Sequence, residues 1–82
     1  MLELVLEKID NLIEILYSVD KNGIDENFME LIEVLLQLVE AEKLTGNVEF
    51  NQILMELQNA YVKKDLVELA DVLKYRLKLF LQ

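Results

Sequence analysis

The chain has 82 residues, of which 44 are apolar and 18 are leucine, and its formal net charge is −8. It contains no Cys, His, Pro or Trp, one Ser and one Thr. These absences exclude disulfides, thiolate nucleophiles and imidazole bases or ligands, and the negative charge argues against a nucleic-acid partner. The length predicts one helical domain over residues 1–82, and nothing in the composition indicates a cofactor or a small-molecule substrate.

Acidic residues interrupt the apolar ones every three or four positions. No apolar run therefore approaches the about 20 residues that a membrane span needs. Glu3 places an acid where a signal peptide carries positive charge. We therefore expect no membrane partner and a cytoplasmic location.

In chain order, the apolar spacing predicts an all-α, antiparallel up-and-down four-helix bundle with helices over residues 2–20, 26–44, 48–62 and 66–81. Gly23 and Gly46 each follow a periodic segment and are predicted to end helices in the left-handed conformation. Asp25, Asn47 and Asp65 are predicted to cap the next three helices. The break before Asp65 lacks a glycine, so one kinked helix in place of the last two is the alternative.

Two of these helices carry the single apolar stripe of a core-facing bundle helix. In the first helix the stripe comprises Leu2, Val5, Leu6, Ile9, Leu12, Ile13, Leu16 and Val19. In the third helix it comprises Phe50, Ile53, Leu54, Leu57, Ala60 and Tyr61. The opposite face of the third helix is mostly neutral and polar, with Asn51, Gln52, Gln58 and Asn59.

The second and fourth helices are apolar over more of their circumference than one core stripe requires. A bundle needs about three core positions in seven, which is about 30 over four helices of this length, and the chain has 44 apolar residues. The surplus of about a dozen predicts a contact surface on these two helices. Its predicted residues are Met29, Val34, Leu36, Val67, Val72, Tyr75, Arg76, Leu79 and Leu81.

Arg76 lies within the apolar sector of the fourth helix, where a buried guanidinium would need a carboxylate partner. Either its stem carries the charge out to solvent, or it forms an ion pair across a helix interface, for example with an acid on one of the first two helices. Residues 1–41 carry a net charge of −8 and residues 42–82 a net charge of 0. The C-terminal cations Lys74, Arg76 and Lys78 either complement the helix dipole or dock on the acidic half of this bundle or of a second copy.

The acidic residues of the second helix form one narrow stripe, which we interpret as a solvated face because no His accompanies it. No nucleophile has a base beside it, so we expect no enzyme. The expected function is a non-catalytic protein–protein interaction module that self-associates, as a homodimer, or shields a helical partner like a chaperone or adaptor. The alternatives are a carboxylate-based metal-binding or enzymatic bundle, and an acidic regulatory protein that binds a basic partner.

Residues 57–75 contain a short break, Asp65-Leu66, and then Leu69-Ala70-Asp71 and Leu73. This pattern resembles segments of small helical proteins of Gram-positive anaerobes. It also resembles a helix start in flagellar export chaperones, which are small antiparallel bundles. The resemblance implies a binding protein with a hydrophobic groove and no catalysis. The Trp or Arg expected near that helix start is absent, so no functional residue is carried over.

Overall fold

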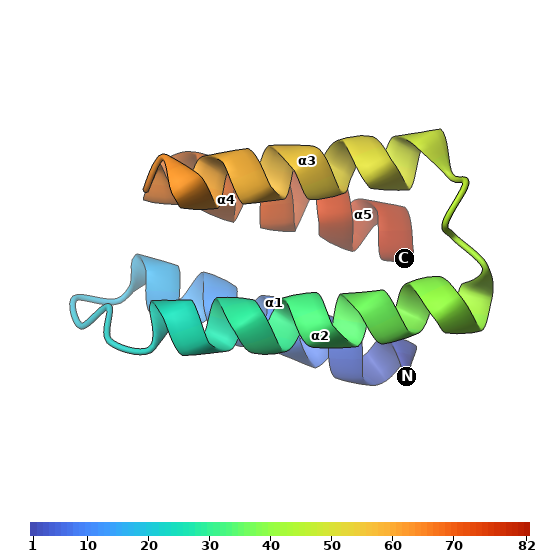
Figure 1. Ribbon diagram of the computed structural model, residues 1–82. Helices are drawn as coiled ribbons and strands as arrows, with labels where there is room; N and C mark the ends of the chain where they lie inside the picture. Colours follow the sequence, from blue (N-terminus) through green and yellow to red (C-terminus); the bar gives the residue numbers. More distant parts are fainter.

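The computed structural model describes residues 1–82, which form an all-α, antiparallel four-helix bundle (Figure 1). Helix α1 spans Leu2–Tyr17, α2 spans Ile24–Glu42 and α3 spans Val48–Val62. The fourth rod comprises α4 (Leu66–Val72), the π-helical turn η1 (Leu73–Leu77) and α5 (Lys78–Leu81). The predicted fold class is confirmed, and both ends of the chain lie at the same end of the bundle.

The four rods lie in two layers, with α1 and α2 below and α3 and the fourth rod above in the view of Figure 1. Helix α1 packs against α2 and also against α4, η1 and α5, while α3 packs against α4 and η1. Helix α2 and the fourth rod therefore lie diagonally across the bundle. Their outer faces point to opposite sides of the molecule.

The core consists of 18 buried residues, and all of them are apolar. Every rod contributes one stripe, and the predicted stripes of the first and third helices face this core. Leu2 and Val19 are the exceptions, since both are exposed. Eleven further apolar residues, partly buried, pack around the core.

Helix α1 ends at Tyr17, three residues before its predicted end, and Val19 is fully exposed in the following turn. The side chains of Ser18 and Lys21 donate hydrogen bonds to backbone carbonyls at the end of this helix. The Lys21 ammonium donates hydrogen bonds to the carbonyl oxygens of Leu16 at 3.1 Å and of Ser18 at 2.7 Å. A cation in this place also complements the helix dipole, so the chain leaves the helix before Val19 can reach the core.

The predictions for Asp25 and Gly46 are wrong, and that for Gly23 is right only in conformation. Gly23 is left-handed, with φ 87°, but it directly precedes α2. Helix α2 therefore begins at Ile24, and Asp25 lies inside its first turn. At the other end of α2, Lys43 takes the left-handed position, with φ 54°, whereas Gly46 has no positive φ.

The break between α3 and α4 is a complete helix end, so the last two helices are separate. Lys64 is left-handed, with φ 57°. The backbone N–H of Lys64 donates to the carbonyl of Tyr61 and that of Asp65 to the carbonyl of Ala60, both at 3.0 Å. This is the hydrogen-bond pattern that closes helix C-termini, here with Lys in place of the usual glycine.

The predicted helix caps Asn47 and Asp65 are confirmed. Each side-chain oxygen accepts a hydrogen bond from the backbone N–H three residues later, at 2.8 Å for Asn47 and 3.1 Å for Asp65. Such caps satisfy donors that have no partner inside the helix. Asp65 therefore closes α3 with its backbone and opens α4 with its side chain.

The π-helical turn η1 turns Arg76 away from the core face of the fourth rod. In a continuous α-helix, Leu73 and Arg76 would follow Leu69 on the same face. In η1 the backbone N–H of Lys78 donates to the carbonyl of Leu73, five residues back. A π-turn adds about one residue, or about 100° of rotation. Arg76 is thereby turned away from the core and is exposed, while Leu77 is fully buried.

Candidate functional site

The candidate site is the set of apolar side chains that the bundle leaves exposed. Five of the predicted contact residues belong to this set: Met29 and Leu36 on α2, and Val67, Tyr75 and Leu79 on the fourth rod. Met29 and Leu36 are each 58% exposed, and the other three are at least 60% exposed. Most of the surface of these side chains lies outside the core and is accessible to another molecule.

Three other predicted residues do not lie on an open surface. Val34 and Val72 are buried in the core, and Leu81 is partly buried against it. Each rod has neighbours on two sides, so the bundle covers a wider sector of α2 and α4 than a single stripe. Val34 and Val72 lie at the edges of these covered sectors, and placing them on the contact surface was wrong.

The exposed residues of α2 and of the fourth rod also do not form one surface. Because the two rods are diagonal, Met29 and Leu36 lie on one side of the bundle and Val67, Tyr75 and Leu79 on another. A partner helix that covers one group cannot also cover the other. The predicted surface is therefore divided into two separate patches.

Arg76 forms an ion pair across a helix interface, but its partner lies on α3 and not on α1 or α2. The guanidinium Nε lies 3.1 Å from Glu56 Oε1, and Nη2 donates to Oε2 at 3.3 Å. The two side chains are 44% and 33% exposed. A pair this exposed contributes about 0.2–1 kcal/mol, so its main effect is to neutralise Glu56 at the edge of α3.

The other C-terminal cations dock on α1 of the same bundle. Lys78 pairs with Asp10 at 2.8 Å, and Lys74 donates a hydrogen bond to the Tyr17 hydroxyl at 3.4 Å. The hydrogen bond to Tyr17 raises the pKa of Lys74 above its usual value. Of the predicted roles for the C-terminal cations, these contacts match docking on the acidic half of the same bundle.

An aromatic contact joins α2 to α3 at one end of the bundle. The rings of Phe28 and Tyr61 are stacked, with centroids 3.9 Å apart and planes within 2°. The Tyr61 hydroxyl donates a hydrogen bond to a carboxylate oxygen of Asp25. This hydrogen bond raises the pKa of Tyr61 above its usual value. Asp25 therefore links α2 to α3, although it does not cap α2.

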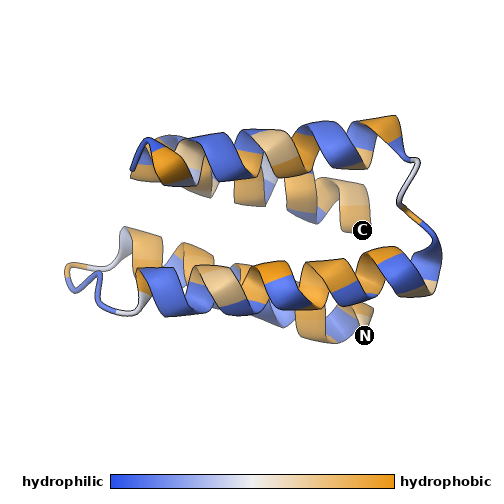
Figure 2. Cartoon of the chain, viewed as in Figure 1, coloured by the Kyte–Doolittle hydropathy of each residue, from blue (hydrophilic) through white to orange (hydrophobic).

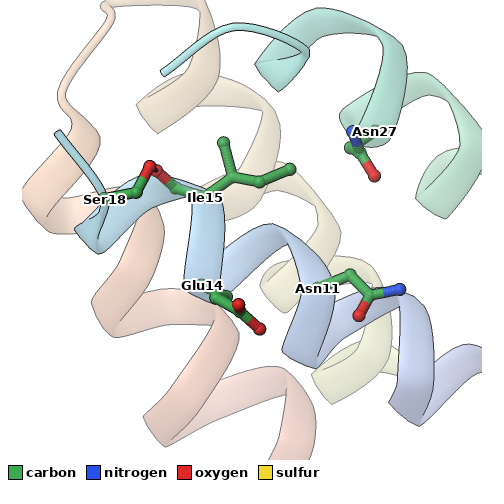
Figure 3. A pocket seen from close by; sticks show the side chains of 5 residues that line it. All are labelled: Asn11, Glu14, Ile15, Ser18 and Asn27. Atoms are coloured by element: carbon green, nitrogen blue, oxygen red, sulfur yellow. Dashed lines mark hydrogen bonds between the residues drawn. The ribbon is translucent and has the colours of Figure 1, made fainter. Parts of the chain in front are cut away.

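The hollow drawn in Figure 3 lies between α1 and the start of α2 and has a volume of about 400 Å³. Its lining offers one carboxylate, from Glu14, two amides, from Asn11 and Asn27, and the hydroxyl of Ser18. That hydroxyl donates to the carbonyl of Ile15 at 2.8 Å. The hollow therefore holds no nucleophile paired with a base.

Two further hollows lie at the ends of the bundle. One, of about 540 Å³, is bordered by Lys21, Asp25, Tyr61 and Lys64 among others, and the second, of about 300 Å³, is lined mainly by apolar residues. No group of three or more acidic side chains lies close enough together to hold a metal ion. None of the helices combines the length and the apolar character needed to cross a membrane.

The sequence reasoning missed three exposed apolar residues on α3: Val48, Met55 and Val62. They are seven residues apart and lie opposite the core stripe, and this spacing was the signal that could have identified them. Hydrophilic and hydrophobic stretches alternate along α3 in Figure 2. Met55 is 58% exposed, the same fraction as Met29.

Comparison of the chain with protein-family models, with curated proteins and with solved structures finds no match.

Proposed function

We propose that this protein is a non-catalytic interaction module that associates with a second copy of itself or covers a helix of a partner. The observation that carries the proposal is the exposure of large apolar side chains on the outer face of every rod. Besides Met29 and Met55, these include Leu4 on α1 and Leu79 on α5, each more than 40% exposed. Burying one such side chain contributes about 1.5–3 kcal/mol, so several of them buried together can offset the about 4–15 kcal/mol that association costs.

The small size of the domain supports the same proposal. Its core of 18 buried residues is modest, and domains of this size often gain stability by association. The rods are stiff and amphipathic, so a docking helix would meet a preformed surface. A module of this kind works by binding and needs no reactive group.

The test is the molar mass of the purified protein in solution, measured by light scattering after size exclusion over a wide concentration range. A mass that rises toward two chains, or binding of an apolar dye that a helical partner competes away, is the expected result. A constant single-chain mass together with no dye binding would contradict the proposal.

A further inference from the structure

The outer face of α3 reads the same in both directions along the helix. Its seven residues are, in order, Val48, Asn51, Gln52, Met55, Gln58, Asn59 and Val62. All seven are exposed, and none is charged. Relative to Met55, they lie at three, four and seven positions on either side. These spacings place them on one face of the helix, centred on Met55.

A face with this symmetry is complementary to itself. In a two-fold contact both molecules use the same patch, so a residue that contacts a second residue of the partner is matched by the reverse contact. If two copies of α3 pack antiparallel with the axis at Met55, Val48 faces the partner's Val62. Asn51 then faces the partner's Asn59. An amide both donates and accepts hydrogen bonds, so amides that face amides can be satisfied.

The charge of the molecule favours this face for contact between copies. The chain carries a net charge of −8, so two copies repel each other over most approaches. The outer faces of α1, α2 and the fourth rod all include exposed charged residues, such as Glu7, Glu33 and Glu68. At the edge of the α3 face, Glu56 is neutralised by Arg76 at 3.1 Å.

We propose that the outer face of α3 is a two-fold contact between two copies of this chain, with antiparallel helices and Met55 on the axis. The inference rests on the proposed function in its self-associating form and names the surface that carries it. The face runs from Val48 to Val62, the full 15 residues of α3, and its two ends are about 21 Å apart. One helix pair of that length forms a small interface, so the dimer belongs to the weak class that forms at micromolar concentrations or above.

The first test compares two methionines that are equally exposed. Sedimentation equilibrium is measured for the wild type, for Met55→Glu and for Met29→Glu, since both methionines are 58% exposed. Met55→Glu places two like charges together at the axis and should weaken the dimer at least about tenfold. Met29→Glu should leave the dissociation constant within about twofold of the wild type. Circular dichroism checks that both variants keep the wild-type helix content.

The outcomes separate this inference from the proposed function. A dimer that Met55→Glu leaves intact would overturn the α3 contact, while self-association itself would stand. A wild type that stays monomeric at the highest concentration would overturn the α3 contact and the self-associating form of the proposed function together. A dimer that both variants weaken equally would also overturn the α3 contact.

The second test fixes the direction of the helices, and the absence of native cysteine gives it a clean background. Packed helix axes lie about 8–10 Å apart and Cα atoms about 2.3 Å from each axis, so Cα atoms facing across the axis lie about 4–5 Å apart. Disulfides form within that range. Met55→Cys should therefore cross-link at least about tenfold faster than the equally exposed Met29→Cys.

Val48→Cys alone should not cross-link, because the antiparallel arrangement separates the two copies of this residue by about 21 Å. A mixture of Val48→Cys and Val62→Cys should form the mixed disulfide. Cross-linking of Val48→Cys with itself would overturn the antiparallel arrangement, and equal rates for Met55→Cys and Met29→Cys would overturn the contact.

Discussion

Deleting Arg76 should leave the bundle folded, because η1 behaves as a one-residue insertion in the fourth rod. Removal of one residue from Leu73–Leu77 lets the segment close as an ordinary α-helix. Leu77 then follows Leu73 by three residues, which keeps it on the core-facing side. Phe80, which packs against the core, keeps its position relative to Leu77.

The energetic cost of this deletion follows from what is lost. The pair between Arg76 and Glu56 is 44% and 33% exposed, and solvent screening limits such a pair to about 0.2–1 kcal/mol. The free energy of unfolding should therefore fall by no more than about 1 kcal/mol, which corresponds to a drop in melting temperature of about 8 °C or less. Arg76→Ala, which removes the same ion pair without changing the register, should cost about as much.

Deletion of Glu33 from the middle of α2 is the matched control, because α2 has no π-turn to absorb it. The helix beyond the deletion turns by about 100° and moves Leu35 and Leu38 out of the core. Both are buried, and each contributes about 1.5–3 kcal/mol. Together they amount to about 3–6 kcal/mol, against a total stability of about 4–12 kcal/mol for a chain of this length.

Urea unfolding followed by far-ultraviolet circular dichroism measures all three variants against the wild type. We expect the free energy of unfolding of the Arg76 deletion to lie close to that of Arg76→Ala, and that of the Glu33 deletion to lie far below both. Two results would refute the view that η1 is a one-residue insertion that can be deleted. One is a similar loss of stability in both deletions, and the other is a loss in the Arg76 deletion that exceeds the loss in Arg76→Ala by several kcal/mol.

Three further changes test the local backbone and the aromatic contact. Gly46→Ala should raise the free energy of unfolding by about 0.4–1 kcal/mol, because no atom lies within 4 Å of the added Cβ. Gly23→Ala should lower it, because φ is 87° at that position. Melting curves of the two variants check that their effects have opposite signs. Lys64→Gly should stabilise the protein by about 0.5–1 kcal/mol in urea unfolding, since Lys64 is left-handed, and a loss would contradict this reason. The folded-state pKa of Tyr61 is raised above 10.0, so the stabilisation from its hydrogen bond to Asp25 is present below pH 10.0 and is lost as the pH rises through the folded-state pKa. The stability difference between wild type and Tyr61→Phe should shrink over that range, and a difference that is independent of pH would contradict the assignment.

The fold was predictable because the apolar periodicity specifies which side of each helix faces the core. Asn47 and Asp65 were predictable as caps because their side chains act on a backbone N–H only three residues away. Glycine was a less reliable indicator of helix ends, because the left-handed residues at the ends of α2 and α3 are Lys43 and Lys64. At such ends the hydrogen bonds to the last carbonyls favour the conformation strongly enough to offset the about 1–2 kcal/mol that an L residue loses there.

The amount of surplus apolar surface was predictable, but its position was predictable only in part. The 18 buried and 11 partly buried core residues come close to the about 30 expected for a bundle of this length. The exposed apolar residues occur on every rod, and Val48 and Met55 on α3 were missed. Sequence gives the angle between residues on one helix, whereas exposure depends on how each rod is rotated and on which neighbours it has. The π-turn left one signal in the sequence, which is the position of Arg76 within the apolar sector of the fourth helix.

Charge separates exposed apolar residues that burial alone cannot distinguish. Met29 is surrounded at three and four positions by Asp25, Glu26 and Glu33, so two copies that meet there bring carboxylates together. Met55 has only amides at the corresponding positions. Like charges about 4 Å apart cost about 1–4 kcal/mol near a protein surface, which is similar to the about 1.5–3 kcal/mol gained by burying one methionine. For equal exposure, the neutral surroundings of Met55 therefore favour contact with a second copy, and the acidic surroundings of Met29 oppose it.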